Sequence, residues 1–209
     1  MKQVLEGTNV VVIVGAWNIA IFTPEWVKEH LLPEGGFKIF YPSMVNCSLK
    51  FQTNQLAFCI EGNRLQFEVT NPELRSDAYV EIIRLLRIIL RKLPFTPITA
   101  MGTNYVFDYD KTFEVLNTLG DKEPLENIVN LLGTGVKSQA LVRKFDMGDK
   151  EELTIRLDAP TEGQKRIDFN FNYAVKSAND VINIIGDEDQ LLNVNEALAV
   201  KIVGEVYGE

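Results

Sequence analysis

The chain has 209 residues, of which 46% are hydrophobic and 24% are charged, the balance of an ordinary soluble domain. Its 21 basic and 29 acidic residues give a net charge of −8. Phosphate contacts need clustered Lys and Arg, so this charge disfavours nucleic acid and anionic membranes as partners. Two cysteines and one histidine are too few for a disulfide framework or a His- or Cys-rich metal site, and we expect neither metal nor cofactor.

The apolar run from Val10 to Phe22 is the first structural feature of the chain. It is shorter than the roughly 20 residues of a membrane helix, and no small-residue cleavage site follows it. Its β-branched start, residues 10–14, predicts a strand that is buried on both faces. We therefore expect a cytoplasmic protein with neither a membrane segment nor a secretion signal.

A short helix and a meander of strands are predicted next. Thr23 and Pro24 begin the helix, because Thr is a good N-cap and Pro fits the first turn. Strands are then predicted over residues 37–41, 47–52, 56–60 and 65–69. Apolar and polar residues alternate in the last three, which indicates an antiparallel meander with one dry face. The helix predicted over 72–92 has apolar residues at helical spacing and should cover that face.

The order of elements then starts again. Further elements are predicted as a strand over 98–109, a helix over 111–132, strands over 139–147, 153–158 and 166–175, and a helix over 187–206. This order predicts an α+β fold, in which a curved antiparallel sheet carries its helices on one side. It also indicates two related halves, a β-α-β4-α unit over 1–93 and a β-α-β3-α unit over 94–209, packed as one body.

This element order resembles the duplicated fold of the TATA-box-binding protein, in which two halves form one curved sheet with helices on its convex side. The segments 62–70 and 96–105, with the helix between them, are similar to a sporadically distributed family of uncharacterised microbial proteins. Neither resemblance implies an activity for this chain. Minor-groove binding needs basic and amide side chains on the sheet, whereas the open face predicted here mixes acidic with basic residues.

The strongest candidate surface is the polar side of the strands over 153–158 and 166–175. Both strands alternate strictly, so that apolar side chains should face the helices and polar side chains the opposite side. The candidate binding residues are Arg156, Asp158, Asp168, Asn170 and Asn172. Such groups can orient a small polar ligand or the backbone of a partner, although the same pattern is typical of a hydrated sheet face.

A second candidate surface is a basic stripe on the helix over 72–92. Arg84, Arg87 and Arg91 recur at helical spacing and could dock an acidic partner or a phosphate. The alternative is the solvated side of an amphipathic helix, with cations near the C-terminus where the helix dipole favours them.

Catalytic motifs are weak in this sequence. The segment 133–138 departs from a phosphate-binding loop, because Val136 stands where the pattern requires Gly. We therefore expect a non-enzymatic protein-binding or assembly module, with another protein or a second copy as partner. One alternative is a small-ligand-binding protein or enzyme with a pocket between sheet and helices, near Trp17, Asn18, Asn104 and Tyr105. A third and weaker hypothesis is a protein that binds single-stranded nucleic acid by aromatic stacking.

Overall fold

The computed structural model describes residues 2–5, 8–33, 35–41, 48–109, 131, 138–148, 151–160, 165–186 and 190–207. The strands are β1 (Lys2–Val4), β2 (Asn9–Gly15), β3 (Lys38–Phe40), β4 (Leu49–Gln52), β5 (Leu56–Glu61), β6 (Arg64–Val69), β7 (Ile98–Tyr109), β8 (Ser138–Gly148), β9 (Glu151–Pro160) and β10 (Lys165–Ala174). The helices are α1 (Pro24–His30), α2 (Arg75–Lys92), α5 (Ala178–Ile185) and α6 (Gln190–Tyr207), with 3₁₀ turns η1 (Ile19–Ile21) and η2 (Pro72–Leu74). The helix predicted over 111–132 lies, except for residue 131, outside the described residues.

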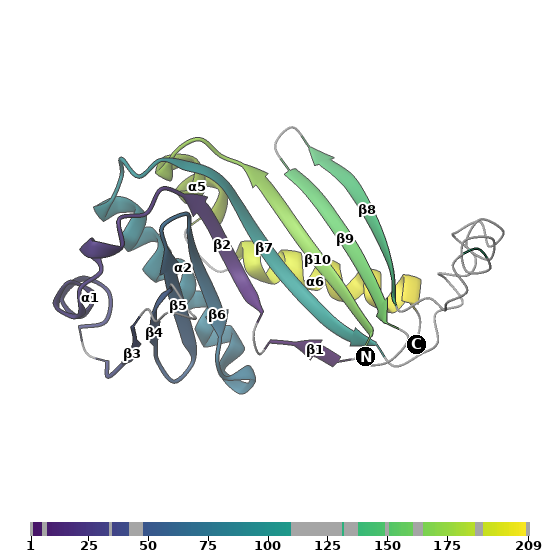
Figure 1. Cartoon of the computed structure of the whole chain (residues 1–209), viewed down its shortest axis with the longest axis horizontal. Helices are drawn as coiled ribbons and strands as arrows, with labels where there is room; N and C mark the ends of the chain where they lie inside the picture. Colours follow the sequence, from purple (N-terminus) through teal and green to yellow (C-terminus); the bar gives the residue numbers. More distant parts are fainter. Residues whose placement is uncertain are drawn as a thin grey trace.

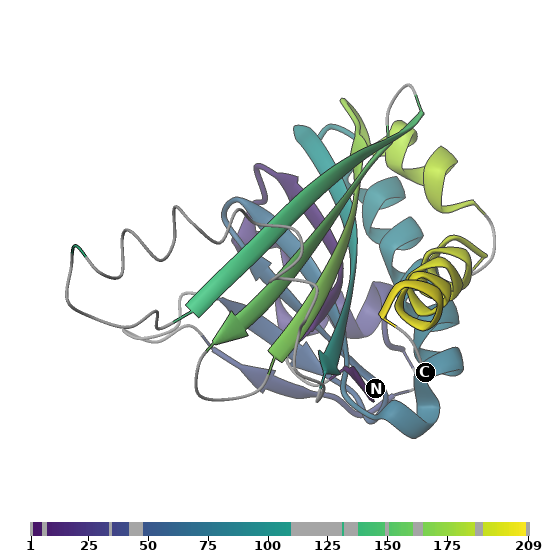
Figure 2. The same ribbon diagram turned by 90° about the vertical axis from the view of Figure 1, so that its right-hand side faces the viewer.

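The ten strands of the described residues form one open antiparallel sheet, in the order β3-β4-β5-β6-β2-β7-β10-β9-β8, with β1 paired to β7. Strands β2 and β7, the first long strands of the two predicted halves, are neighbours in the sheet. Each is flanked by the last strand of its own half, β6 or β10. Helices α2, α5 and α6 lie on one side of the curved sheet (Figures 1 and 2). The α+β class and the one-sided sheet are thus confirmed. No helix in the described ranges is long and apolar enough to cross a membrane.

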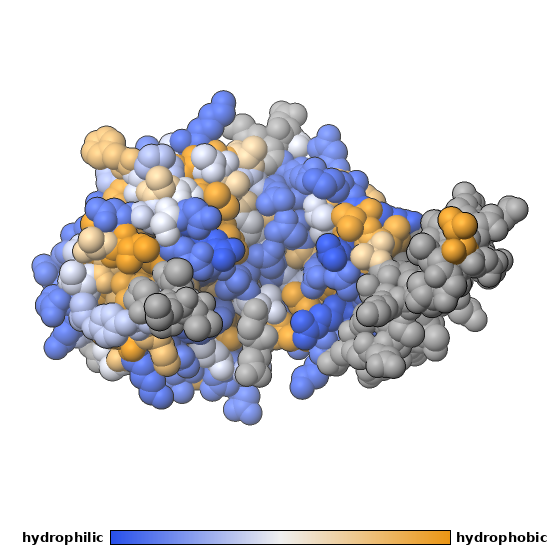
Figure 3. Space-filling model, viewed as in Figure 1, coloured by the Kyte–Doolittle hydropathy of each residue, from blue (hydrophilic) through white to orange (hydrophobic). Residues whose placement is uncertain are grey.

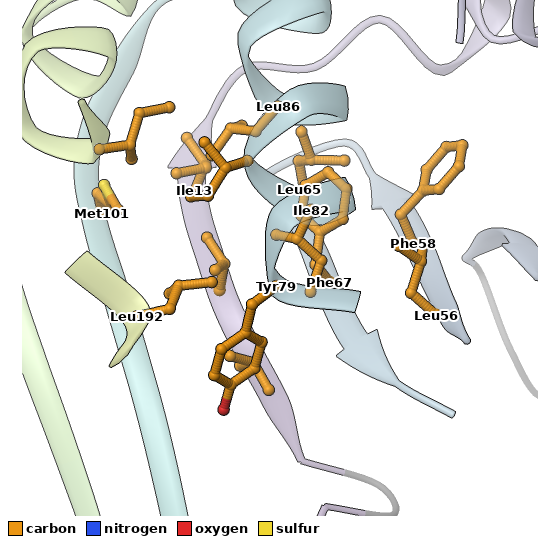
Figure 4. Close-up of a cluster of buried hydrophobic side chains, with 14 of the residues drawn as sticks. Ile13, Leu56, Phe58, Leu65, Phe67, Tyr79, Ile82, Leu86, Met101 and Leu192 are labelled. Carbon is orange, nitrogen blue, oxygen red and sulfur yellow. The ribbon is translucent and has the colours of Figure 1, made fainter. Parts of the chain in front are cut away.

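The dry face of the meander packs against α2, as the alternation predicts. Figure 4 shows side chains of β2, β5 and β6 pointing toward this helix. They include Ile13, Leu56, Phe58, Leu65 and Phe67 from the sheet and Tyr79, Ile82 and Leu86 from α2, each fully buried. Burial of this apolar area is the main force that holds α2 on the sheet.

Polar groups also hold α6 on the sheet. The Asn195 amide donates to the Thr103 hydroxyl (2.9 Å) and to the Tyr173 hydroxyl (2.7 Å), and the Tyr105 hydroxyl donates to the Leu192 carbonyl (2.8 Å). Each of these donors and acceptors is buried, where a hydrogen bond without a partner would be costly. Among the described residues, every buried side-chain nitrogen or oxygen has a hydrogen-bond partner.

A second set of polar contacts joins β1 and α2 to α6. The carboxylate of Glu196 accepts from the Gln3 amide (2.6 Å) and the Tyr79 hydroxyl (3.2 Å), and it lies 3.1 Å from an Arg75 guanidinium nitrogen. Arg75 also donates to the Gln3 side chain at 2.9 Å. These contacts link residues from opposite ends of the chain and fix α6 against α2.

Gly15 lies at a point of close backbone approach between β2 and β7. A Cβ there would come 2.4 Å from the Pro97 carbonyl oxygen, and the Ala16 amide already donates to that oxygen at 2.9 Å. We expect Gly15→Ala to lower the free energy of unfolding by about 1–3 kcal/mol, because the backbone must shift. Gly204→Ala, with no atom near its Cβ, should instead stabilise α6 by about 0.5–1 kcal/mol. Urea denaturation of both variants tests the contrast, and equal effects would contradict it.

Candidate functional site

Strand pairing brings the five predicted binding residues onto one face of the sheet. In the β9–β10 ladder Asp168 lies opposite Arg156, Asp158 opposite Arg166, and Asn170 opposite Thr154. The alternate residues of both strands are buried toward the helices, as predicted. Figure 3 views this open side and shows hydrophilic residues along its middle. We call Asn104, Arg156, Asp158, Asp168, Asn170 and Asn172 the polar face.

The charged part of the polar face is internally paired. Arg156 donates to both carboxylate oxygens of Asp158, at 2.7 and 3.0 Å, and this pairing raises the pKa of the guanidinium. Burial raises the pKa of Asp168, the nearby Asp158 raises it further, and Arg156 and Arg166 oppose the shift. Positive and negative groups therefore alternate over a short distance, and this suits a partner of mixed polarity better than a polyanion.

The amide part of the polar face is a short hydrogen-bonded chain. The Asn170 amide donates to the Asn104 side-chain oxygen, and the Asn104 amide donates to the Asn9 carbonyl at 2.7 Å. Gly102 makes room for these groups, since a Cβ there would lie 3.3 Å from the Asn170 nitrogen and 3.4 Å from the Asn172 oxygen. Asn104 thus belongs to this face, where it extends the predicted set of residues onto β7.

An open hollow of about 1010 Å³ lies at one end of the polar face. Its lining includes Asn172, Ala100, Lys144 and Glu152, and Lys144 donates to Glu152 at 2.8 Å. The hollow is shallow and lined by polar and apolar groups alike. It extends the polar face toward strand β8 and does not enclose a ligand.

The basic stripe on α2 is partly used by the fold itself. Arg84 donates through two nitrogens to Glu81, each at 2.6 Å, and to the Leu31 carbonyl at the end of α1, also at 2.6 Å. The hydrogen bond to Glu81 raises the pKa of Arg84. Arg87 is half-buried and Arg91 is exposed. Arg84 therefore ties two helices together, and the docking role of the stripe stays a prediction.

The residues proposed for an internal pocket do not meet. Trp17 is buried and donates to the Ile13 carbonyl at 3.3 Å, whereas Asn18 caps η1. Asn104 and Tyr105 project from opposite faces of β7, Asn104 into the polar face and Tyr105 toward α6. The close approach at Gly15 is filled by the backbone of residue 97.

Cys59 is a half-buried thiol on the open side of β5. Burial raises its pKa to about 11, and the nearby Lys50 opposes this shift. A thiol with this pKa is protonated near neutral pH and is therefore a poor nucleophile.

Sequence comparisons with known proteins identify no relative, so the site is interpreted from its geometry alone. A scan against protein-family models finds no match for this chain, and no curated protein matches its sequence.

Proposed function

We propose that this protein is a non-enzymatic protein-binding or assembly module, and that the polar face is its recognition surface. The observation that supports this most is the convergence of polar side chains from three adjacent strands on the side of the sheet that none of the described helices covers. Hydrogen bonds within the face hold Arg156, Asn170 and Asn104 in place. Groups fixed in this way lose little conformational entropy when a partner binds.

The shape and charge of the face favour a protein over a small molecule. Small-molecule sites are enclosed and mostly apolar, whereas this face is polar and its adjoining hollow is open. Protein interfaces commonly combine such polar contacts with bridging water. The acidic groups Asp158 and Asp168 beside Arg156 also disfavour a phosphate backbone as partner. A cytoplasmic location stays part of the proposal.

Native mass spectrometry of the protein, purified gently from its own host, tests this function. We expect a complex with another protein or with a second copy. The double variant Arg156→Ala/Asn170→Ala should weaken that complex roughly tenfold or more, because central polar anchors carry much of the binding energy. Arg64→Ala is the matched control, since Arg64 makes the same two-nitrogen contact with Glu61 on the same side of the sheet in the other half.

The outcomes separate the alternatives. If no complex of the protein is weakened in a folded double variant, the assignment of the polar face is contradicted. A small molecule bound to the monomer, with no protein partner, would instead favour the alternative of a ligand-binding protein or enzyme.

A further inference from the structure

Strand β8 is a long edge strand with apolar side chains. It pairs with β9 along one side, and no described strand pairs with its other side (Figure 2). Residues 142–148 are all exposed, including Val142 (50%), Phe145 (41%) and Met147 (42%). An edge of this length offers a row of backbone donors and acceptors to another strand. Its partner can be inferred from its charges.

The charges of β8 complement those of a second copy. Lys144 and Asp146 are two residues apart, so they lie on the same face of the strand with opposite signs. If two β8 strands pair antiparallel about Phe145, Lys144 of each copy lies opposite Asp146 of the other. The Phe145 side chains of the two copies then lie side by side, on the face of the strand opposite to Lys144 and Asp146. Edge strands that resist self-pairing typically carry Lys, which repels the same Lys of a second copy. In β8 the Lys would instead face an Asp of the second copy and attract it.

Other registers place these residues less favourably. Pairing centred on Lys144 puts Lys144 opposite itself, and pairing centred on Arg143 or Asp146 likewise opposes two equal charges. Lys144 is 64% exposed, and although it donates to Glu152 at 2.8 Å, its ammonium has further donors for a second carboxylate. Pairing centred on Val142 opposes no two charges, so among the registers centred on residues 142–146 only the one about Phe145 sets opposite charges against each other.

We infer that β8 pairs antiparallel with β8 of a second copy, with the two-fold axis at Phe145, so that one sheet runs through both molecules. The inference rests on the proposed function, because it names the partner for assembly. It uses the sheet edge, however, and not the polar face, so the two can fail separately.

Charge reversal with complementation tests the pairing and its register by sedimentation velocity over a range of concentrations. The wild type should dimerise reversibly. Lys144→Asp alone and Asp146→Lys alone should each weaken the dimer roughly thirtyfold, because the symmetry turns two attractive cross-strand pairs into repulsive ones. An equimolar mixture of the two variants should recover a mixed dimer, since every cross-strand pair is again of opposite sign.

Two controls separate pairing from folding. The double variant Lys144→Asp/Asp146→Lys should dimerise like the wild type, because reversing both charges restores the match. Lys38→Asp, a charge reversal on the short edge strand β3, should leave dimerisation unchanged. Circular dichroism would show that each variant is folded.

Several results would overturn the inference. These are a wild type that stays monomeric at all concentrations, a Lys144→Asp variant that dimerises normally, or a mixture that stays monomeric. A monomeric protein that still binds another protein through the polar face would overturn the edge pairing alone. A β8 dimer in which Arg156→Ala/Asn170→Ala has no effect on any complex would overturn only the role of the polar face.

Discussion

Raising the pH from 10 to 11 is expected to remove a large part of the folding stability, because three tyrosines are buried in their uncharged form. Tyr79, Tyr105 and Tyr173 are 0%, 1% and 6% exposed. Burial is the main cause that raises the pKa of each, and Glu196 or Glu151 nearby raises it further. All three phenols therefore keep their protons in the folded protein well above the pH at which a free tyrosine ionises.

The direction of the effect follows from proton linkage. In the unfolded chain a tyrosine loses its proton near pH 10, whereas the folded protein retains it. Above pH 10 the unfolded state thus binds fewer protons, and stability falls as the pH rises. Because a free tyrosine is already half ionised at pH 10, each buried tyrosine loses about 1 kcal/mol between pH 10 and 11, and the three together lose roughly 3 kcal/mol. This compares with about 5–15 kcal/mol for a typical domain.

Urea denaturation at pH 8, 9, 10 and 11 measures this loss. Tyr105→Phe should reduce the slope above pH 10 by about a quarter, because it removes one of the three buried phenols, while the Cys59 thiol, whose pKa is raised to about 11, contributes with the same sign. The same variant should cost about 1 kcal/mol at neutral pH, since it loses the hydrogen bond to the Leu192 carbonyl. A stability that is flat between pH 9 and 11 would contradict the burial of uncharged tyrosines.

Alternation in the sequence was enough to predict the sheet faces, because a strand with one buried side has a period of two. The residues predicted to face the helices, Leu56, Phe58 and Ile60 in β5 and the alternate apolar residues of β6, β9 and β10, are buried. Among the strands and α-helices, β1 and α5 were not predicted. β1 has three residues and exists through its pairing with β7 more than a hundred positions away. α5 has eight residues, and its start depends on a hydrogen bond from the Asp180 amide to the Ser177 side chain.

The candidate site could be predicted only in part, because some of its contacts join segments that are distant in the sequence. The polar side chains of β9 and β10 follow from alternation, and their pairing needed only adjacent strands. That Asn104 joins them depends on the register of β7 against β10, which places it opposite Asn170. Arg84 likewise shows no sign in the sequence that it donates to the carbonyl of Leu31, 53 positions earlier. Contacts between distant segments are set by tertiary packing, which local patterns do not encode.

Phe67→Ala is expected to lower the free energy of unfolding by about 3–5 kcal/mol. The Phe67 ring is fully buried, 5.8 Å from the Phe58 ring, so its loss leaves a cavity between β6 and α2. Phe95→Ala is the matched control, because Phe95 is 95% exposed and should cost less than about 0.5 kcal/mol. Urea denaturation of both variants gives the two values.

The same substitution tests whether the two predicted halves unfold together. β2 pairs with β7, α2 packs against α5, and Tyr79 of α2 donates to Glu196 of α6, so the buried cluster is continuous across both halves. Hydrogen exchange should therefore accelerate by a similar factor, roughly a hundredfold or more, in β4–β6 and in β10 and α6. Acceleration confined to the first half would instead mean that residues 1–93 and 94–209 are separate folding units, and that the first can unfold while the second stays folded.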